Sequence, residues 1–163
     1  MTSLLLFGYG NPGRGDDALG PLLIERIAGL QLAEIVCQQD MQLQVEHVTD
    51  LATCDLALFV DADMSCSAPL EFSELTAVKD TSYSSHAMTP AALLHAYQQV
   101  YGKDSPPAFL LRIRGYEFEL GDPLSTRAIA NLDAANGCVV DLCATRTMSH
   151  WQQRLTRRIA EQK

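Results

Sequence analysis

The chain has 163 residues, of which 47% are hydrophobic and 20% charged, and these values are typical of one globular domain covering residues 1–163. The formal net charge of −8 disfavours nucleic acid as a partner, because positive charge supplies most of the affinity for phosphate backbones. No apolar run approaches the roughly 18 residues of a membrane span, and the first residues lack the pattern of a secretory signal. We therefore expect a cytoplasmic protein that does not bind membranes.

The first part of the chain predicts alternating strands and helices. Four apolar residues, Leu4 to Phe7, run into Gly-x-Gly, and this predicts a strand buried on both faces, as in parallel sheets. Apolar residues at helical spacing predict a helix from about Asp17 to Ala28, with Asp16 as its N-cap and Gly29 at its end. The pattern then predicts a strand, a short helix and another buried strand at residues 33–38, 43–51 and 56–60.

The second part predicts an edge strand, two helices and one more buried strand. Residues 70–78 alternate between apolar and polar, which indicates a half-exposed strand, antiparallel at the sheet edge. Thr89 and Pro90 predict a helix start, and that helix ends near Tyr101. A strand at 108–113, a helix from Ser125 or Thr126 to Leu142 and an apolar stripe over 148–159 follow. This order predicts an α/β fold: a three-layer αβα sandwich around a mostly parallel, twisted sheet of about five strands, with the opening strand near its centre.

The turn after the first strand is open to two nucleotide-related interpretations. Gly8, Gly10 and Gly13 match the dinucleotide-binding pattern G-x-G-x-x-G, with Asp40 as the ribose ligand. However, Asp40 is 27 residues beyond Gly13 rather than roughly 20, and Asp16-Asp17 would place negative charge where a pyrophosphate binds. The turn also resembles the start of peptidyl-tRNA hydrolase, through the segment Gly8-Tyr9-Gly10-Asn11-Pro12-Gly13. The histidine-asparagine pair that follows this segment in that family is missing here.

A metal site is the third interpretation. Asp17 follows the first strand, Asp61 ends the third, and His86 precedes the helix that begins at Thr89. In a parallel sheet these places converge on one edge. Two carboxylates and one imidazole make a three-ligand metal site with positions left for substrate and water. Taken singly, each residue also has an ordinary structural interpretation, as a helix cap, a strand-end turn residue or a loop histidine.

Three motifs spread over nearly the whole chain resemble the hydrogenase maturation endopeptidases. They are Gly10-Asn11-x4-Asp16-Asp17-x2-Gly20, Val60-Asp61-Ala62 after an apolar strand, and Ser84-Ser85-His86-Ala87-Met88-Thr89-Pro90. The resemblance implies an α/β enzyme that removes a short C-terminal extension from the precursor of the large subunit of a nickel-iron hydrogenase, after nickel has been inserted. It also implies that Asp17, Asp61 and His86 are the metal-binding and catalytic trio, and that the nickel arrives with the substrate. Either Asp61 or Asp63 could also act as a base in the reaction, and we favour Asp61 because it matches the family motif.

The sequence departs from the family pattern at two places. Many members have glutamate where this chain has Asp17, and many have an Asp-Gly-Gly-Thr turn where this chain has Asp40-Met41-Gln42-Leu43-Gln44. The Gln42–Gln44 and Arg114–Phe118 segments resemble most closely the members that serve soluble, NAD-linked hydrogenases. The alternative functions are a nickel-handling metallochaperone and a dinucleotide-binding enzyme.

Overall fold

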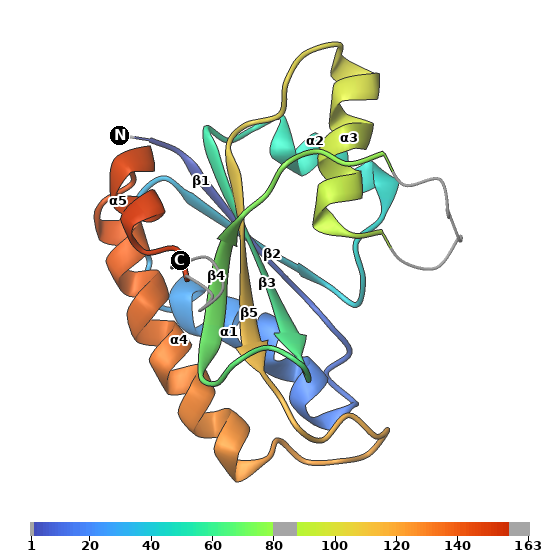
Figure 1. Ribbon diagram of the computed structural model, residues 1–163, viewed down its shortest axis with the longest axis vertical. Coiled ribbons are helices and arrows are strands. Elements are labelled where there is room, and N and C mark those ends of the chain that lie inside the picture. Colours follow the sequence, from blue (N-terminus) through green and yellow to red (C-terminus); the bar gives the residue numbers. More distant parts are fainter. Residues whose placement is uncertain (1, 80–87, 157–163) are drawn as a thin grey trace, which may run out of the picture.

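The structure is a computed structural model that describes residues 2–79 and 88–156. Five strands form one sheet: β1 (Leu4–Tyr9), β2 (Ile35–Asp40), β3 (Leu56–Asp63), β4 (Leu70–Glu74) and β5 (Ala108–Arg114). Five helices accompany it: α1 (Leu19–Ala28), α2 (Val48–Leu51), α3 (Pro90–Tyr101), α4 (Thr126–Ala144) and α5 (Met148–Gln153). Two 3-10 turns, η1 (Gly15–Ala18) and η2 (Val45–His47), precede α1 and α2. The predicted α/β class is confirmed (Figure 1).

The strand order across the sheet is β2-β1-β3-β5-β4. All neighbouring strands are parallel except β4, which runs antiparallel to β5 at one edge. This confirms the predicted mostly parallel sheet, the antiparallel edge strand and the internal position of the opening strand. The carboxyl ends of β1, β2 and β3 lie at the same edge of the sheet, which we call the carboxyl edge.

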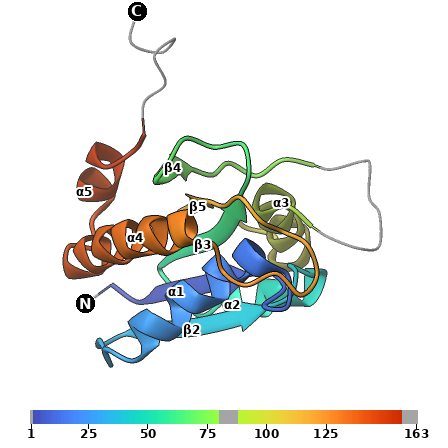
Figure 2. The same ribbon diagram turned by 90° about the horizontal axis from the view of Figure 1, so that it is seen from below.

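Strand alternation divides the core into two layers of side chains. Leu4 and Leu6 pack with α1, α4 and α5 on one face of the sheet, whereas Leu5 and Phe7 pack with α2 and α3 on the other. Figure 2 shows these two groups of helices on opposite sides of the strands. Both faces of β1 and β3 are therefore covered, as their continuous apolar runs predict.

Local sequence signals place α3 at its predicted residues. The Thr89 hydroxyl accepts a hydrogen bond from the backbone N–H of Ala92 at 3.1 Å, Pro90 is the first helical residue, and Gly102 ends the helix with φ of 68°. At the other end of the chain, the buried Trp151 of α5 packs against Phe72 and Phe109. No helix within residues 2–79 and 88–156 is both long enough and apolar enough to cross a membrane.

Candidate active site

Tyr9 and Asp61 lie next to each other at the carboxyl edge. Gly8 of β1 pairs with Val60 of β3, so Tyr9 and Asp61 are the next residues on neighbouring strands. Alternation turns both side chains to the face that carries α2 and α3. Asp17 of η1 lies close enough for its negative charge to act on Asp61. The structure thus brings together the two carboxylates that the sequence singles out.

Burial and repulsion perturb the Asp61 carboxyl. Desolvation and the negative charge of Asp17 raise its pKa to about 7, against smaller lowering effects from the Ala62 backbone N–H and the Tyr9 hydroxyl. The Arg112 guanidinium on the neighbouring strand is turned to other partners, and Asp61 has no ion pair within the described residues. A carboxyl that changes protonation state near neutral pH, in a cleft, is a frequent feature of functional sites.

Tyr9 is a site residue that the sequence analysis missed. Burial, together with the neighbouring Asp61 carboxylate, raises the pKa of the Tyr9 hydroxyl well above its usual value. The phenol therefore stays protonated at neutral pH and can donate a hydrogen bond toward Asp61 or toward a ligand. The alternation Leu5, Phe7, Tyr9 was the available signal, because it puts Tyr9 on the same sheet face as Asp61.

Asp17 is held by the glycine-rich turn. Its Oδ2 accepts a hydrogen bond of 2.7 Å from the backbone N–H of Asn11. Gly10 makes this possible, since its φ is 149° and a Cβ at this residue would overlap the Asp17 carbonyl oxygen. The turn is therefore packed directly against the residue that carries the second carboxylate.

Gly10→Ala is expected to lower the free energy of unfolding by roughly 2 to 4 kcal/mol, because the added methyl group meets backbone that cannot move aside. Urea denaturation measures this loss. Gly121→Ala is the matched control: Gly121 also has a positive φ, of 90°, but a Cβ at this residue would meet no atom within 4 Å. Equal losses in the two variants would contradict the close-approach explanation.

Asp16 has a different role from the predicted N-cap. It makes no capping bond to η1 or α1, so that prediction is wrong. Its fully buried carboxylate instead accepts hydrogen bonds from the backbone N–H groups of Tyr116, Glu117 and Ser125 and from the Ser125 hydroxyl, at 2.7 to 3.0 Å. Burial opposes ionisation, but these bonds outweigh it and lower the pKa of Asp16. Asp16 therefore fastens the loop after β5 to the opening turn.

The same contacts argue against the dinucleotide-binding interpretation. The Asn11 N–H, which would have to face a phosphate, donates to the Asp17 carboxylate instead, and the Gly10 N–H donates to the Asp40 carbonyl oxygen at 3.1 Å. The Asp40 carboxylate itself lies 2.7 Å from the Met41 N–H and 3.2 Å from His47 Nε2. The turn therefore offers a pyrophosphate negative charge rather than free donors.

Asp63 lies on the same sheet face as Asp61 but is engaged elsewhere. Its carboxylate accepts hydrogen bonds from the Ser65 N–H and hydroxyl, both at 2.7 Å, and from Arg112 Nη1 at 3.0 Å. Arg112 Nη2 also donates to Glu71 at 2.8 Å. Burial opposes these bonds, yet their sum lowers the pKa of Asp63. Asp63 is therefore a structural partner of Arg112.

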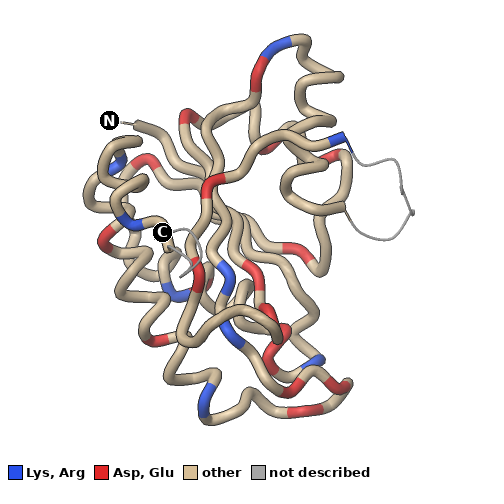
Figure 3. Tube along the Cα trace, in the orientation of Figure 1, with Lys and Arg blue, Asp and Glu red and all other residues tan. Residues whose placement is uncertain are grey.

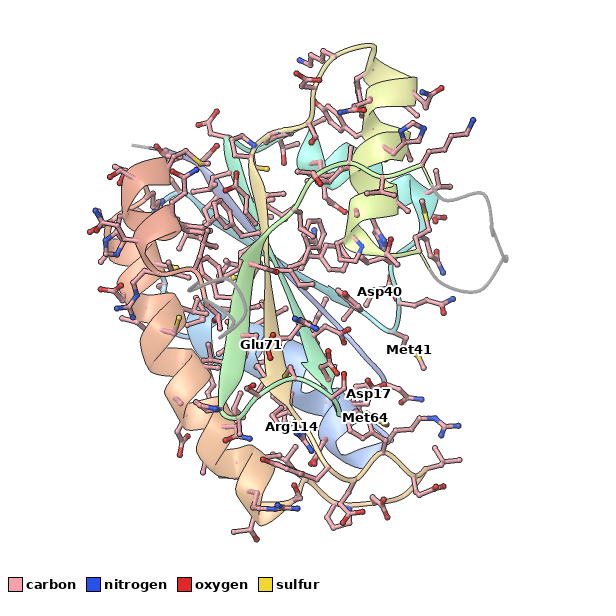
Figure 4. All side chains as sticks on the ribbon, viewed as in Figure 1. Asp17, Asp40, Met41, Met64, Glu71 and Arg114 are labelled. Atoms are coloured by element: carbon pink, nitrogen blue, oxygen red, sulfur yellow. The ribbon has the colours of Figure 1, made fainter. Side chains whose placement is uncertain are left out.

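The carboxyl edge is acidic. Figure 3 shows Asp and Glu residues gathered around the ends of the strands and in the loop below them. Figure 4 shows Asp17 and Asp40 at this end of the sheet, together with Met41 and Met64. Both methionines are exposed, Met41 by 58% and Met64 by 62%.

A cleft of about 700 Å³ opens beside Asp61. Tyr9 and Asp61 line it from the sheet, and most of its other lining residues are apolar. Met88 and Thr89, which directly precede α3, also line this cleft. A ligand in the cleft would therefore touch both the perturbed carboxyl and the start of α3.

His86, the third predicted ligand, lies outside the described residues. Within the residues that the structure does describe, no three His, Cys, Asp or Glu side chains are grouped so that they could hold a metal ion. Of the predicted trio, the structure therefore describes two members, Asp17 and Asp61.

Comparison with known proteins gives matches in fold but not in sequence family. No protein-family model matches the chain, and no curated protein matches it in sequence. Solved structures with the same fold, however, include maturation proteases of hydrogenases.

Two of them cover most of the chain. The maturation protease HycI from Thermococcus kodakarensis KOD1 has a TM-score of 0.69 and 21% identity, covering 88% of this chain and 94% of its own. The hydrogenase maturating endopeptidase HybD from E. coli has a TM-score of 0.63 and 20% identity, covering 86% of this chain and 91% of its own. At this level of identity the similarity establishes a common fold, and the activity has to be argued from the site.

Proposed function

We propose that this chain is a single-domain endopeptidase that removes the C-terminal extension of a nickel-loaded hydrogenase large-subunit precursor in the cytoplasm. The observation that carries this proposal is the Asp61 carboxyl, which lines a cleft and whose pKa is raised to about 7 by burial and by the negative charge of Asp17. The shared fold with the maturation proteases HycI and HybD supports it.

In this proposal Asp17, Asp61 and His86 recognise the nickel that the precursor already carries. Carboxylates and a neutral imidazole suit such a metal, and a precursor without nickel offers these groups nothing to bind. A metal held beside an amide polarises the carbonyl and activates water for attack. Metal occupancy of the substrate would thereby decide whether cleavage occurs.

The protein's own contribution is the arrangement of the two acids. Asp17 is held by the Asn11 N–H, and Asp61 lies beside the protonated Tyr9 hydroxyl. Asp61, whose pKa is about 7, must lose its proton to act as a ligand, and His86 must be neutral, so activity is expected to rise as pH increases from about 6 to above 7. The assignment to a subgroup serving soluble, NAD-linked hydrogenases remains a prediction from residues 42–44 and 114–118.

The decisive experiment mixes the purified chain with a cognate nickel-loaded precursor and follows the intact mass of the precursor. Loss of a C-terminal peptide is expected, and none with the nickel-free precursor. We expect the cleavage rate to fall at least about 100-fold in each of three variants, Asp17→Ala, Asp61→Ala and His86→Ala. Removing one group that stabilises a transition state typically lowers the rate by about this much. Asp40→Asn, at the exposed end of β2, is the matched control and should cleave normally.

Other outcomes separate the alternatives. An intact precursor after incubation, with nickel loading verified, would contradict the proposal. If the chain also retains stoichiometric nickel through desalting, the metallochaperone becomes the better explanation. If the precursor is cut equally well by all three alanine variants, the protease activity stands but the assigned residues are wrong.

A further inference from the structure

The cleft beside Asp61 has an apolar wall that takes no part in the proposed metal-dependent chemistry. Leu75, Val78, Met88 and Leu110 line it, together with the small residue Ala91. Its volume of about 700 Å³ falls within the range of roughly 300 to 1,000 Å³ that is usual for ligand sites. A space of this size holds several side chains.

Backbone hydrogen bonds hold the segment that forms part of this wall. The segment that follows β4 passes from β5 to α3 (Figure 1). The Leu75 N–H donates to the Ala108 carbonyl at 2.9 Å, and the Val78 N–H donates to the Ala91 carbonyl at 3.1 Å. This segment is therefore fastened at both ends, and the apolar wall exists before any ligand binds.

Val78 is an apolar side chain that remains open to solvent. It is 54% exposed although it lines the cleft. A ligand that covered it would remove this apolar surface from water, which is favourable by roughly 25 cal/mol per Å². Charge is sparse here, since Lys79 is the only cation and Asp61 the only anion among the described lining residues.

We propose that this cleft is a specificity site that binds apolar side chains of the substrate peptide next to the scissile bond. The proposal rests on the proposed endopeptidase function. An amide that reacts beside Asp61 must continue as a peptide on both sides, and the cleft that contains Asp61 offers one of these sides an apolar path. The occupant is thus the extended, apolar stretch of the precursor that adjoins the cleavage point.

Val78→Asp tests this inference with little risk to folding, because the residue is exposed. We expect the KM for the nickel-loaded precursor to rise at least about tenfold, with kcat nearly unchanged, since only binding of the peptide is weakened. Val100→Asp is the matched control: Val100 is 60% exposed near the other end of α3, and its variant should behave like wild type. An unchanged KM for Val78→Asp would overturn the inference while leaving the protease activity in place.

A charge exchange tests the direct contact. A precursor in which the apolar residues flanking the scissile bond are replaced by aspartate should be a poor substrate for wild type. Val78→Lys should recover at least part of the lost kcat/KM with this altered precursor, through the new pair of opposite charges. Absence of any recovery, together with an unchanged KM in the first test, would exclude Val78 as a contact.

A binding measurement separates failure of this inference from failure of the proposed function. Methyl-labelled protein is titrated with a synthetic peptide that spans the cleavage point of the precursor, and methyl NMR shifts are recorded. Shifts of Leu75, Val78 and Leu110, absent at Val100, would support the apolar site even if wild type does not cleave the precursor. No shift at these three residues in a protein that does not cleave would overturn the inference as well.

Discussion

Asp61→Asn is expected to stabilise the folded chain at pH 8 by roughly 1 to 3 kcal/mol while it abolishes cleavage of the precursor. The physical reason is that the wild-type protein must keep this carboxylate charged in a buried place beside Asp17. The amide has no charge to desolvate and no repulsion with Asp17. Its oxygen still accepts a hydrogen bond from the Tyr9 hydroxyl, so a polar partner is kept.

The pH dependence has a definite sign. The pKa of Asp61 is about 7 in the folded chain and near the ordinary value of 3.8 when unfolded, so the folded state binds the proton more tightly. The associated stability is fully present below pH 3.8 and is lost as pH rises to about 7. The advantage of Asp61→Asn should therefore be small at pH 4 and largest at pH 8.

Urea denaturation of both proteins at several pH values measures this difference. Asp63→Asn, on the same strand face, is a control for which the opposite effect on stability is expected. The hydrogen bonds from Ser65 and Arg112 lower the pKa of Asp63 against the effect of burial. Its removal should destabilise the protein at pH 8. Parallel stability curves for wild type and Asp61→Asn would contradict the burial and repulsion assigned to Asp61.

Asp16→Ala is expected to lower the free energy of unfolding by roughly 3 to 5 kcal/mol, because it leaves several buried donors without an acceptor. The affected groups are the N–H donors of Tyr116, Glu117 and Ser125 and the Ser125 hydroxyl, all now bonded to one carboxylate. The loop between β5 and α4 should lose its attachment to the opening turn, which would appear as faster amide exchange at residues 116, 117 and 125.

Asp17→Ala is the neighbouring control. It loses one hydrogen bond, from the Asn11 N–H, and relieves repulsion with Asp61. Its stability should therefore change by about 1 kcal/mol or less, although we expect its activity to be lost. If the two alanine variants are equally destabilised, the division between a structural Asp16 and a functional Asp17 is wrong.

Much of the fold follows from local patterns. The apolar runs of β1 and β3 predict buried parallel strands because a strand covered on both faces has no polar side. The cap at Thr89, the proline at 90 and the glycine at 102 predict α3 correctly because each acts through contacts within one helical turn. The alternation after Leu70 predicts the antiparallel edge strand, although β4 ends at Glu74 rather than Val78.

The site was less accessible from the sequence alone. Asp16 and Asp17 are adjacent and chemically alike, and only the position of the loop after β5, about 100 residues further on, makes one an anchor and leaves the other near Asp61. The distinction between Asp61 and Asp63 likewise depends on Arg112, from another strand. Tyr9 acquires its importance solely from the pairing of β1 with β3.

The sequence by itself determined the α/β architecture, the ends of α3 and the acids that converge on one edge of the sheet, because these depend on periodicity, capping and strand order. Only the tertiary structure decided that Asp16 is buried and hydrogen-bonded, and that Asp61 is buried and repelled by Asp17. It also decided where an apolar cleft adjoins Asp61. Burial, repulsion and long-range hydrogen bonds depend on residues that are distant in the chain, and they determine whether a carboxylate stabilises the fold or is available to a substrate.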